Sequence, residues 1–367
     1  MQKTFDVAVV GGGLVGMAIA FGLAKRGQRV IVCDGEDNAL RAARGNFGLV
    51  WVQGKGANCV SYARWSLHSA ELWQGFADQL LARSGVSIGF SRPGGFNIAQ
   101  SPQELATKAE TMQRLYRAEP RLKFEVLEHK ELAQRLPAIG PDAAGAIYSP
   151  NDGHVSPLYT LRALFAAYEQ VGGEYAPNAN VTEISPASGS FRLRVANGHT
   201  LEAGRVVLAA GLGNRSLAPQ VGLRAPVKPL RGQILVTERV RPFLANPTIY
   251  VRQTVEGSVL VGDSAEDVGF NDSVTPDVLA DIARRAIAPF PLLKHVRVVR
   301  AWGALRVMTP DGLPIYEESP RHPGAFLATC HSGVTLAAAH CETIAPWILG
   351  GDRPALLDSF YANRFAV

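Results

Sequence analysis

The chain has 367 residues, 47% hydrophobic and 19% charged, which is typical of globular proteins large enough for two domains. Its net charge of +5 comes without a run of basic residues, so we expect no nucleic-acid partner. The four cysteines form no Cys-x-x-Cys pair, which argues against a metal site and fits a reducing compartment. No apolar stretch reaches the roughly 20 residues of a membrane span, so we expect a cytoplasmic protein without a transmembrane segment.

The first 34 residues carry the most specific local pattern. In order, they are an apolar strand at 7–10, the motif Gly11-x-Gly13-x-x-Gly16, an Ala/Leu-rich helix to about Arg26, and a strand at 29–33 followed by Asp34. Gly11 permits a tight turn, Gly13 lets the backbone approach a pyrophosphate, and Gly16 lets the helix pack on the strand. Asp34 has the spacing of a carboxylate that binds a ribose hydroxyl. The pattern predicts a dinucleotide site, for NAD or FAD.

The remaining chain alternates predicted helices and strands. Apolar periodicity predicts helices at 61–84, 102–118, 157–171, 276–287 and 333–349, and strands at 180–184, 191–195, 201–203, 205–211, 233–237, 258–262 and 325–330. Asn197-Gly198 predicts a hairpin turn, and the chain from Trp302 to the last strand is expected to be a loop. The strand at 205–211 is apolar throughout and ends at Gly211, as expected of a central parallel strand that meets a cofactor.

These elements predict an α/β protein with two domains. Residues 1–85, 151–218 and 301–367 would form a discontinuous Rossmann-type nucleotide-binding domain. Residues 86–150 and 219–300 would form an inserted α+β substrate domain with a large mixed or antiparallel sheet.

Several motifs, in the same order, resemble the D-amino-acid-oxidase-like flavoproteins, particularly the glycine and sarcosine oxidase branch. Besides the glycine-rich opening, they are the segments 41–50, 154–157, 180–181, 206–211, 250–252, 259–262, 302–315 and 331–335. The resemblance spans nearly the whole chain and implies FAD as the cofactor. Sarcosine oxidases attach flavin through a cysteine near the stretch matching 301–309, where this chain has none, so the FAD is expected to be non-covalent.

Two segments resemble a narrower group. Residues 46–56 and 330–340 are similar to the beta subunits of heteromeric opine oxidases and D-hydroxyproline dehydrogenases. This implies a hetero-oligomer whose partner subunits carry further redox centres, with FMN at a subunit interface as an additional cofactor.

The resemblance also implies which residues bind the cofactor. Val181 would hold the adenine through its backbone, although a plain buried strand residue is the alternative. The helix after His331-Ser332 would direct its N-terminal N–H groups at the flavin pyrimidine edge, where reduced flavin is negative. The alternative is a helix capped by serine without a ligand. The expected cofactor-binding residues are Gly11, Gly13, Leu14, Val15, Gly16, Asp34, Ala42, Ala43, Asn46, Gly48, Leu49, Val181, Gly211, Arg306, Ser332, Gly333, Val334 and Thr335.

Arg306, Tyr250 and His331 are the expected catalytic residues. The guanidinium of Arg306 matches a carboxylate, and the resemblance places it in the substrate pocket; the alternative is a structural salt bridge at a strand end. Tyr250 would bind the carboxylate or close the pocket, unless it is a half-buried strand tyrosine. His331 is expected to position the flavin or line the pocket rather than act as a base. Arg252 is expected either to assist Arg306 or to be solvated.

The function implied is oxidation of the Cα–N bond of an amino acid or N-substituted amino acid of the D-hydroxyproline or opine type. Hydride would pass to flavin N5, an imine would form, and electrons would pass to partner subunits. One alternative is a self-sufficient glycine, sarcosine or D-amino-acid oxidase that reduces oxygen to hydrogen peroxide. A second is a flavin-binding assembly or electron-relay subunit. The sequence does not fix the substrate, its chirality, the electron acceptor or the oligomeric state.

Overall fold

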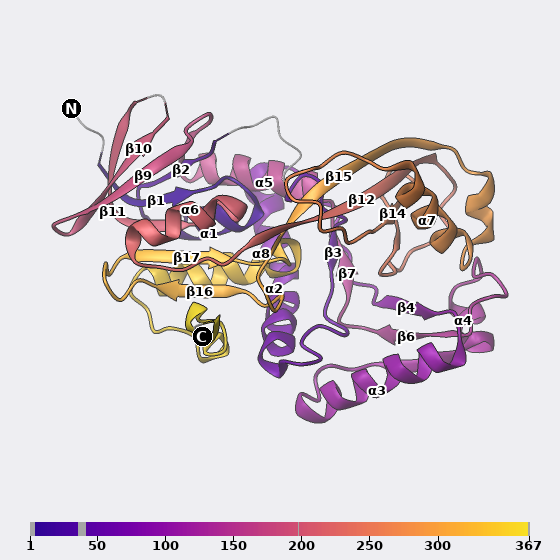
Figure 1. Ribbon diagram of the computed structural model, residues 1–367. Helices are drawn as coiled ribbons and strands as arrows, with labels where there is room; N and C mark the ends of the chain where they lie inside the picture. The colour runs from indigo at the N-terminus through magenta and orange to yellow at the C-terminus, as the bar shows by residue number, and fades with distance from the viewer. Residues whose placement is uncertain (1–3, 36–41, 197, 366–367) are drawn as a thin grey trace.

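The computed structural model describes residues 4–35, 42–196 and 198–365. Two parts lie side by side (Figure 1). One is built around a mainly parallel sheet with helices, and the described chain begins and ends in it. The other is built from antiparallel sheets with α3, α4 and α7 around them.

The first part contains an eight-stranded sheet. Its main path runs β16-β17-β11-β1-β2-β8, and β17, β11, β1, β2 and β8 are parallel. The strands are β1 (Thr4–Val10), β2 (Val30–Cys33), β8 (Glu174–Ala176), β11 (Thr200–Leu208), β16 (Ile315–Glu318) and β17 (Ala325–Thr329), with β9 (Val181–Ala187) and β10 (Ser190–Val195) forming an antiparallel extension of β11. The carboxyl ends of β1, β2, β11 and β17 therefore meet at one edge.

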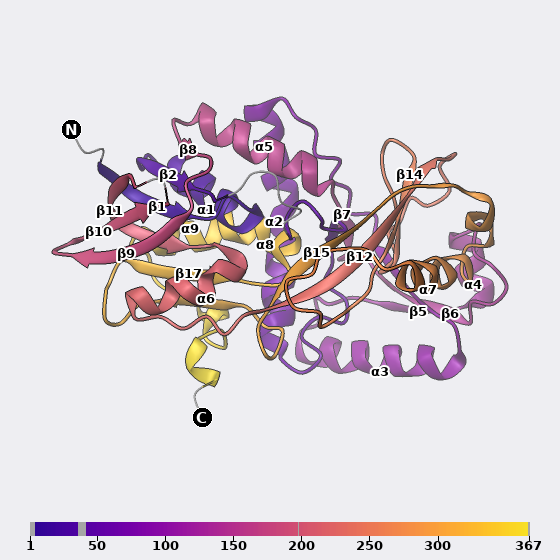
Figure 2. The same ribbon diagram turned by 45° about the horizontal axis from the view of Figure 1, so that its top comes forward.

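This sheet is buried on both faces because alternate side chains enter different cores. Val7 and Val9 pack with the helices, whereas Ala8 and Val10 pack with the β9–β10 hairpin and α6 (Asn214–Leu217). The helices on the first face are α1 (Leu14–Ala24), α2 (Val60–Ser84), α5 (Pro157–Gln170) and α8 (Gly333–Ala339), as Figure 2 shows.

The second part contains two antiparallel sheets around one apolar core. The four-stranded sheet has the order β13-β14-β12-β15, from β13 (Val251–Gln253), β14 (Ser258–Gly262), β12 (Lys228–Arg239) and β15 (Val298–Met308). The three-stranded sheet has the order β4-β6-β5, from β4 (Gly95–Ala99), β6 (Gly145–Ser149) and β5 (Glu125–Glu128). The helices are α3 (Pro102–Ala118), α4 (His129–Arg135) and α7 (Pro276–Ile287).

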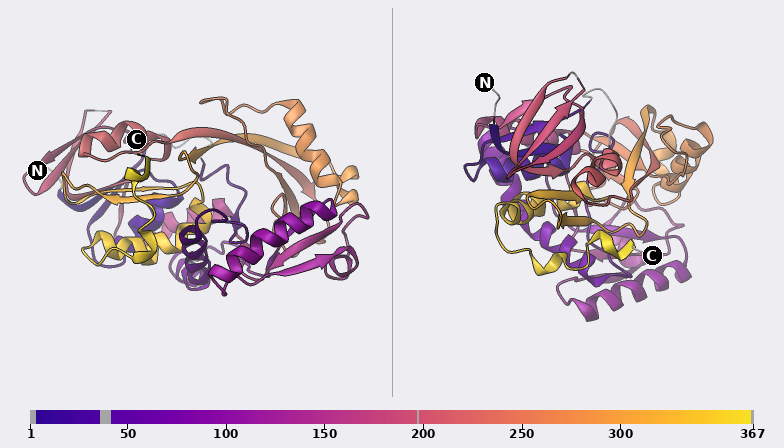
Figure 3. Two further views of the ribbon diagram at one scale, coloured as in Figure 1. Left: turned by 60° about the horizontal axis from the view of Figure 1, so that its bottom comes forward. Right: turned by 60° about the vertical axis from the view of Figure 1, so that its left-hand side comes forward.

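Two connections tie the parts together. The long strands β12 and β15 run from the first part into the second (Figure 3). The short pair β3 (Leu49–Val50) and β7 (Gly153–His154) lies between the two parts in Figure 1. A site between the two parts can therefore take side chains from either end of the chain.

Most predicted elements are confirmed, and three need correction. The strands predicted at 201–203 and 205–211 are one strand, β11, because Gly204 stays within it, and Gly211 follows the strand with φ +58°. The loop predicted from Trp302 to the last strand was wrong at 302–308, which belong to β15 and pair with β12, and at 315–318, which form β16. Gly303 does not mark a loop, since a Cβ there would overlap the carbonyl oxygen of Asp272.

The helix predicted at 333–349 is helical but irregular. After α8, residues 340–344 form a π-helix, and α9 (Ala345–Ile348) follows. Pro346 lacks a backbone N–H and cannot complete the regular hydrogen-bond ladder, which accounts for a change of helix type nearby. In the predicted hairpin turn, Asn197 lies outside the described residues, whereas Gly198 has φ +85°.

Candidate active site

The glycine-rich turn after β1 has the tight geometry that its sequence predicts. Gly11 has φ +109°, and a Cβ there would overlap the backbone of Ala209. A Cβ on Gly16 would overlap the carbonyl oxygen of Gly11. Beside Gly13, the nearest protein atom to an added Cβ is the Cβ of Ala43 at 3.8 Å. Gly11 and Gly16 are therefore required by the fold, whereas the space beside Gly13 belongs to a cavity.

That cavity has a volume of about 630 Å³ and lies at the carboxyl ends of β1, β2, β11 and β17. It gathers most of the predicted cofactor residues from both ends of the chain. Of these, it is lined by Gly11, Gly13, Leu14, Val15, Asp34, Ala42, Ala43, Asn46, Val181, Gly211, Gly333 and Val334. Gly16 lies behind the turn and does not line it.

Asp34 follows β2 and is 7% exposed, on the wall of this cavity. Its Oδ1 accepts a hydrogen bond of 3.0 Å from the backbone N–H of Gly35. A Cβ on Gly12 would lie 2.9 Å from Asp34 Oδ2, so glycine at position 12 leaves room for the carboxylate. A carboxylate beside a glycine turn that leaves open space at Gly13 fits the ribose and pyrophosphate of a dinucleotide.

A second cavity, of about 470 Å³, continues from the first. The two share Ala42, Asn46, Leu305, His331 and Val334 in their walls. Of the predicted site residues, the second cavity is also lined by Leu49, Tyr250, Arg306, Ser332 and Thr335. The predicted cofactor and catalytic residues thus come together in two connected spaces. Gly16 and Gly48 are the exceptions: both line neither cavity, and Gly48 lies against the carbonyl oxygen of Val155.

The wall near β3 offers polar groups to a bound molecule. The indole N–H of Trp51 is buried on this wall and has no hydrogen-bond partner within the described ranges. The hydroxyl of Thr335 accepts from the backbone N–H of Trp51 at 3.2 Å and donates to the carbonyl of Leu49 at 3.2 Å. The start of α8 is therefore fixed to the segment 49–51. An unpaired buried donor here fits a polar flat ring such as that of a flavin.

Arg306 projects from β15 to the second cavity and is one-fifth exposed. Its Nη1 donates to the carbonyls of Ser264 at 2.7 Å and Arg231 at 3.2 Å, and its Nη2 forms an ion pair with Asp263. The predicted cavity position and the alternative of a salt bridge are thus both observed. A Cβ on Gly232 would overlap the guanidinium, so this glycine leaves the space that Arg306 occupies.

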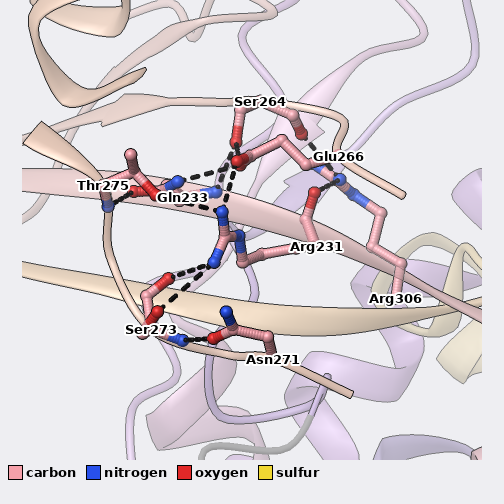
Figure 4. A network of polar contacts seen from close by, with 8 residues as sticks. All are labelled: Arg231, Gln233, Ser264, Glu266, Asn271, Ser273, Thr275 and Arg306. Atoms are coloured by element: carbon pink, nitrogen blue, oxygen red, sulfur yellow. Dashed lines mark hydrogen bonds and ion pairs between the residues drawn. The ribbon is translucent and has the colours of Figure 1, made fainter. Parts of the chain in front are cut away.

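A buried network holds the segment that follows Asp263. Arg231, 4% exposed, donates to Glu266 at 2.6 Å and to the carbonyl of Ser273 at 2.9 Å. Glu266 also accepts from Ser264 at 2.6 Å and from Gln233 at 2.9 Å (Figure 4). The network joins β12 to residues 264–275 and fixes the carbonyl oxygens that receive Arg306.

Tyr250 and Arg252 have different environments. Tyr250 lines the second cavity, and its ring packs against the guanidinium of Arg285, which lies 4.1 Å from the ring centroid. Arg252 is buried and lines neither cavity. It donates to the carbonyl of Phe47 at 2.8 Å, and burial lowers its pKa to about 10. Arg252 therefore holds the segment around Phe47 and does not reach the second cavity as Arg306 does.

His331 lies where the two cavities meet. Protein surrounds its side chain, although the imidazole is exposed to the cavity space. Burial chiefly, together with the charges of Lys55 and Arg306, lowers its pKa to about 4. The imidazole is then neutral and weakly basic at neutral pH, in agreement with a lining role.

The sequence analysis missed two charged residues of the second cavity, Lys55 and Asp263. The Nζ of Lys55 donates to Ser332 at 2.8 Å and to Thr335 at 2.9 Å, and burial lowers its pKa to about 8. A lysine between two glycines, in Gly54-Lys55-Gly56, was the available signal. Asp263 follows an apolar strand directly, which is a further signal of a functional position at a strand end.

The comparisons with known proteins agree with this geometry. The model of the family "DAO: FAD dependent oxidoreductase" matches residues 6–347. The B subunit of opine oxidase from Agrobacterium tumefaciens (strain Ach5) is 45% identical over 365 residues, covering 98% of this chain and 97% of the relative. The B subunit of opine oxidase from Rhizobium meliloti is 43% identical with the same coverage.

The structural comparison confirms the predicted fold. The crystal structure of glycine oxidase from Geobacillus kaustophilus has a TM-score of 0.92, at 26% identity and 100% coverage of both chains. Within the described residues, no helix has the length and apolar character to cross a membrane. The chain is an FAD-dependent oxidoreductase and belongs to the DAO family.

Proposed function

We propose that this protein oxidises the Cα–N bond of an amino acid or N-substituted amino acid, of the D-hydroxyproline or opine type, to an imine. The observation that carries the proposal is the position of Arg306, whose guanidinium can pair with a carboxylate, in a cavity that shares part of its wall with the glycine-lined cavity. The likeness to the opine oxidase relative, at 45% identity, supports the choice of substrate type.

Asp34 and the open space beside Gly13 would hold the ribose and pyrophosphate of FAD, with Val181 beside the adenine. The indole N–H of Trp51 would bind the flavin ring, and Leu49 and Thr335 would lie beside it. The helix that starts at Gly333 would direct its N–H groups at the same ring. Bound FAD supplies the hydride acceptor and carries the redox chemistry.

The cofactor would be non-covalent. Cys330 lines the first cavity, but burial raises the pKa of its thiol to about 12. A thiol that stays protonated at neutral pH is a poor nucleophile, so it does not favour a covalent bond to flavin. The strand β15, which includes the stretch where sarcosine oxidases carry their attachment cysteine, has no cysteine.

The chain's own residues would orient the substrate. Arg306 would bind the carboxylate, Tyr250 would close the pocket, and both hold the Cα hydrogen toward the cofactor cavity. His331, neutral at the junction of the cavities, would exclude water and limit the space. Removal of a hydride from Cα requires a neutral amine, so the amine proton must first pass to solvent or to a group of the pocket.

Electrons would pass to partner subunits, with FMN at a subunit interface as a further redox centre. The opine oxidase relatives are named as one subunit of their enzyme, which supports an assembly of several chains. The likeness to glycine oxidase favours a second candidate, a self-sufficient oxidase that makes hydrogen peroxide. We also propose the domain division 1–85, 151–218 and 301–367 against 86–150 and 219–300; β15 crosses its boundary at 301.

The test is anaerobic reduction of the FAD-loaded protein, monitored through the absorbance of the flavin. Glycine, sarcosine, D-proline, cis-4-hydroxy-D-proline, octopine and nopaline are offered in turn, and air is then admitted. We expect bleaching by a cyclic or N-substituted amino acid and slow reoxidation. Fast reoxidation with peroxide would select the oxidase. No bleaching by any of them would contradict the proposed reaction and favour a relay role.

Arg306→Leu sharpens this test. We expect the second-order rate constant of flavin reduction to fall by roughly 10²–10³-fold, because the carboxylate loses a charge-assisted partner, with FAD content unchanged. The matched control is Arg297→Leu, whose arginine is 84% exposed and paired with Glu238 on the surface. Equal rates in the two variants would show that Arg306 does not bind the substrate.

A further inference from the structure

Asp263 is a charged group that the proposed reaction does not use. Its side chain is 44% exposed and lies on the wall of the second cavity, beside Arg306. Asp263 Oδ2 is paired with Nη2 of Arg306, and no hydrogen bond reaches Oδ1 from any of the residues that the structure describes. One carboxylate oxygen is therefore available to a molecule in the cavity.

The backbone around Asp263 is held in place. Its carbonyl oxygen accepts from Arg285, and the next residue, Ser264, is fixed by hydrogen bonds to Glu266 and Gln233. The Ser264 carbonyl also accepts from Arg306 at 2.7 Å. Because the buried pair of Arg231 and Glu266 already anchors this segment (Figure 4), the half-exposed pair at Asp263 is not needed for that purpose.

Asp263 changes what Arg306 can bind. The charge of the guanidinium is balanced by Asp263, so a plain carboxylate that approaches Arg306 also meets a negative charge. A ligand with a positive nitrogen close to its carboxylate can pair its carboxylate with Arg306 and its nitrogen with Asp263 at the same time. The nitrogen is one carbon away from the carboxylate in every α-amino acid, which matches two opposite charges in direct contact.

We propose that Asp263 and Arg306 form one receptor for a zwitterionic amino-acid end, in which Asp263 binds the positively charged nitrogen on Cα. This rests on the proposed function, which supplies the carboxylate at Arg306. Asp263 then determines specificity: it favours the ammonium form in which amino acids reach the enzyme at neutral pH, and it discriminates against simple carboxylates.

The test uses two ligands of equal shape that differ by one charge. Glycine betaine and 3,3-dimethylbutanoate have the same carboxylate and the same trimethyl group, on nitrogen in the first and on carbon in the second. Neither has the free amine that the reaction requires. A smaller pair, dimethylsulfonioacetate and 3-methylbutanoate, serves if the trimethyl group is too large. Each ligand is titrated into the FAD-loaded protein, and its Kd is read from the change in the flavin spectrum.

We expect the protein to bind the zwitterionic ligand of each pair roughly tenfold more tightly than its anionic partner, the scale of one attraction between opposite charges at a partly exposed site. Asp263→Asn should abolish or invert this preference, because it removes the attraction for the zwitterion and the repulsion of the anion. If the ion pair of Asp263 and Arg306 had only a structural role, Asp263→Asn would weaken the binding of both ligands equally. The matched control is Asp267→Asn, the same change on an exposed residue paired with Lys228, which should keep the preference.

Two outcomes would overturn the inference. The first is equal binding of both ligands of a pair by the unaltered protein, which needs no variant to fold. The second is a preference that survives in Asp263→Asn. If none of the amino acids offered bleaches the flavin of the unaltered protein, whatever the two ligand pairs do, the proposed function itself is wrong. Failure of the function is thereby separated from failure of the Asp263 inference.

Discussion

The two cavities differ in how their walls are assembled. The first is organised by a local turn: Gly11, Gly13 and Asp34 lie within one β-α-β unit and need only neighbouring strands to take their positions. In the second, Arg306 comes from β15, Asp263 from the end of β14 and Lys55 from the segment after β3. The first cavity is therefore specified by short-range sequence and steric fit, and the second by long-range pairing and charge.

The largest effect should come from a glycine within the turn. In Gly16→Ala the new Cβ overlaps the carbonyl oxygen of Gly11, so the backbone must move, and we expect a loss of about 2–4 kcal/mol in the free energy of unfolding. Thermal unfolding of the FAD-free protein measures it. Because the overlap lies within the protein, we expect the same loss of stability with or without cofactor.

Gly13→Ala is the matched control for that change. Gly13 has φ −76°, and the nearest atom to its added Cβ is 3.8 Å away, so the FAD-free protein should unfold at its normal temperature. Only FAD affinity should fall, because the methyl group enters the space proposed for the pyrophosphate. Equal destabilisation by the two substitutions would contradict the distinction between a glycine required by the fold and one required by the ligand.

A smaller effect is expected at the equivalent close contact in the second cavity. The Cβ of Gly232→Ala overlaps the end of the Arg306 side chain, which can move, so stability should change by less than about 1 kcal/mol. The displaced guanidinium should nevertheless raise the KM for the substrate roughly tenfold. Steady-state kinetics measures the KM, and FAD content should not change.

Gly75→Ala is the control, since nothing lies within 4 Å of its added Cβ. If Gly232→Ala lowered FAD affinity and left KM unchanged, the second cavity would not be the substrate's. If Gly232→Ala unfolded the protein, the Arg306 side chain would be held as rigidly as the glycine-rich turn after β1.

The difference between a cavity built from short-range contacts and one built from long-range contacts explains which residues the sequence could predict. The turn, Asp34 and the helix α1 follow from spacing, because each glycine acts on residues close in the chain. Arg306 and Tyr250 were placed through a family resemblance, since nothing in β15 alone marks Arg306 as a cavity residue. The partner of Arg306 could not be found: Asp263 lies 43 residues away, and only the pairing of β14 and β15 with β12 brings them together.

The error at Trp302 has a related cause. Gly303 lies in the interior of β15, where glycine weakens the local preference for a strand. The glycine is instead required by the close approach of Asp272 from another segment. The local sequence pattern cannot distinguish a glycine that ends a strand from a glycine that leaves room for another segment of the same chain.

The smallest expected effect concerns the charge of Lys55. Burial lowers its pKa from about 10.5 to about 8, so raising the pH through 8 removes a positive charge from the second cavity while exposed lysines stay protonated. We therefore expect the Kd of 3,3-dimethylbutanoate to rise by about three- to tenfold between roughly pH 7 and pH 9. In Lys55→Met the Kd should be higher at pH 7 and flat over this range.

Lys228→Met is the control, because this lysine is exposed and paired with Asp267 on the surface. It should keep the pH dependence of the unaltered protein. A Kd that is constant up to pH 9 in the unaltered protein, or a slope that persists in Lys55→Met, would show that the Lys55 charge acts on Ser332 and Thr335 alone. The second cavity would then depend on Arg306 and Asp263 for its charge recognition, and Lys55 would belong with the groups that fix the start of α8.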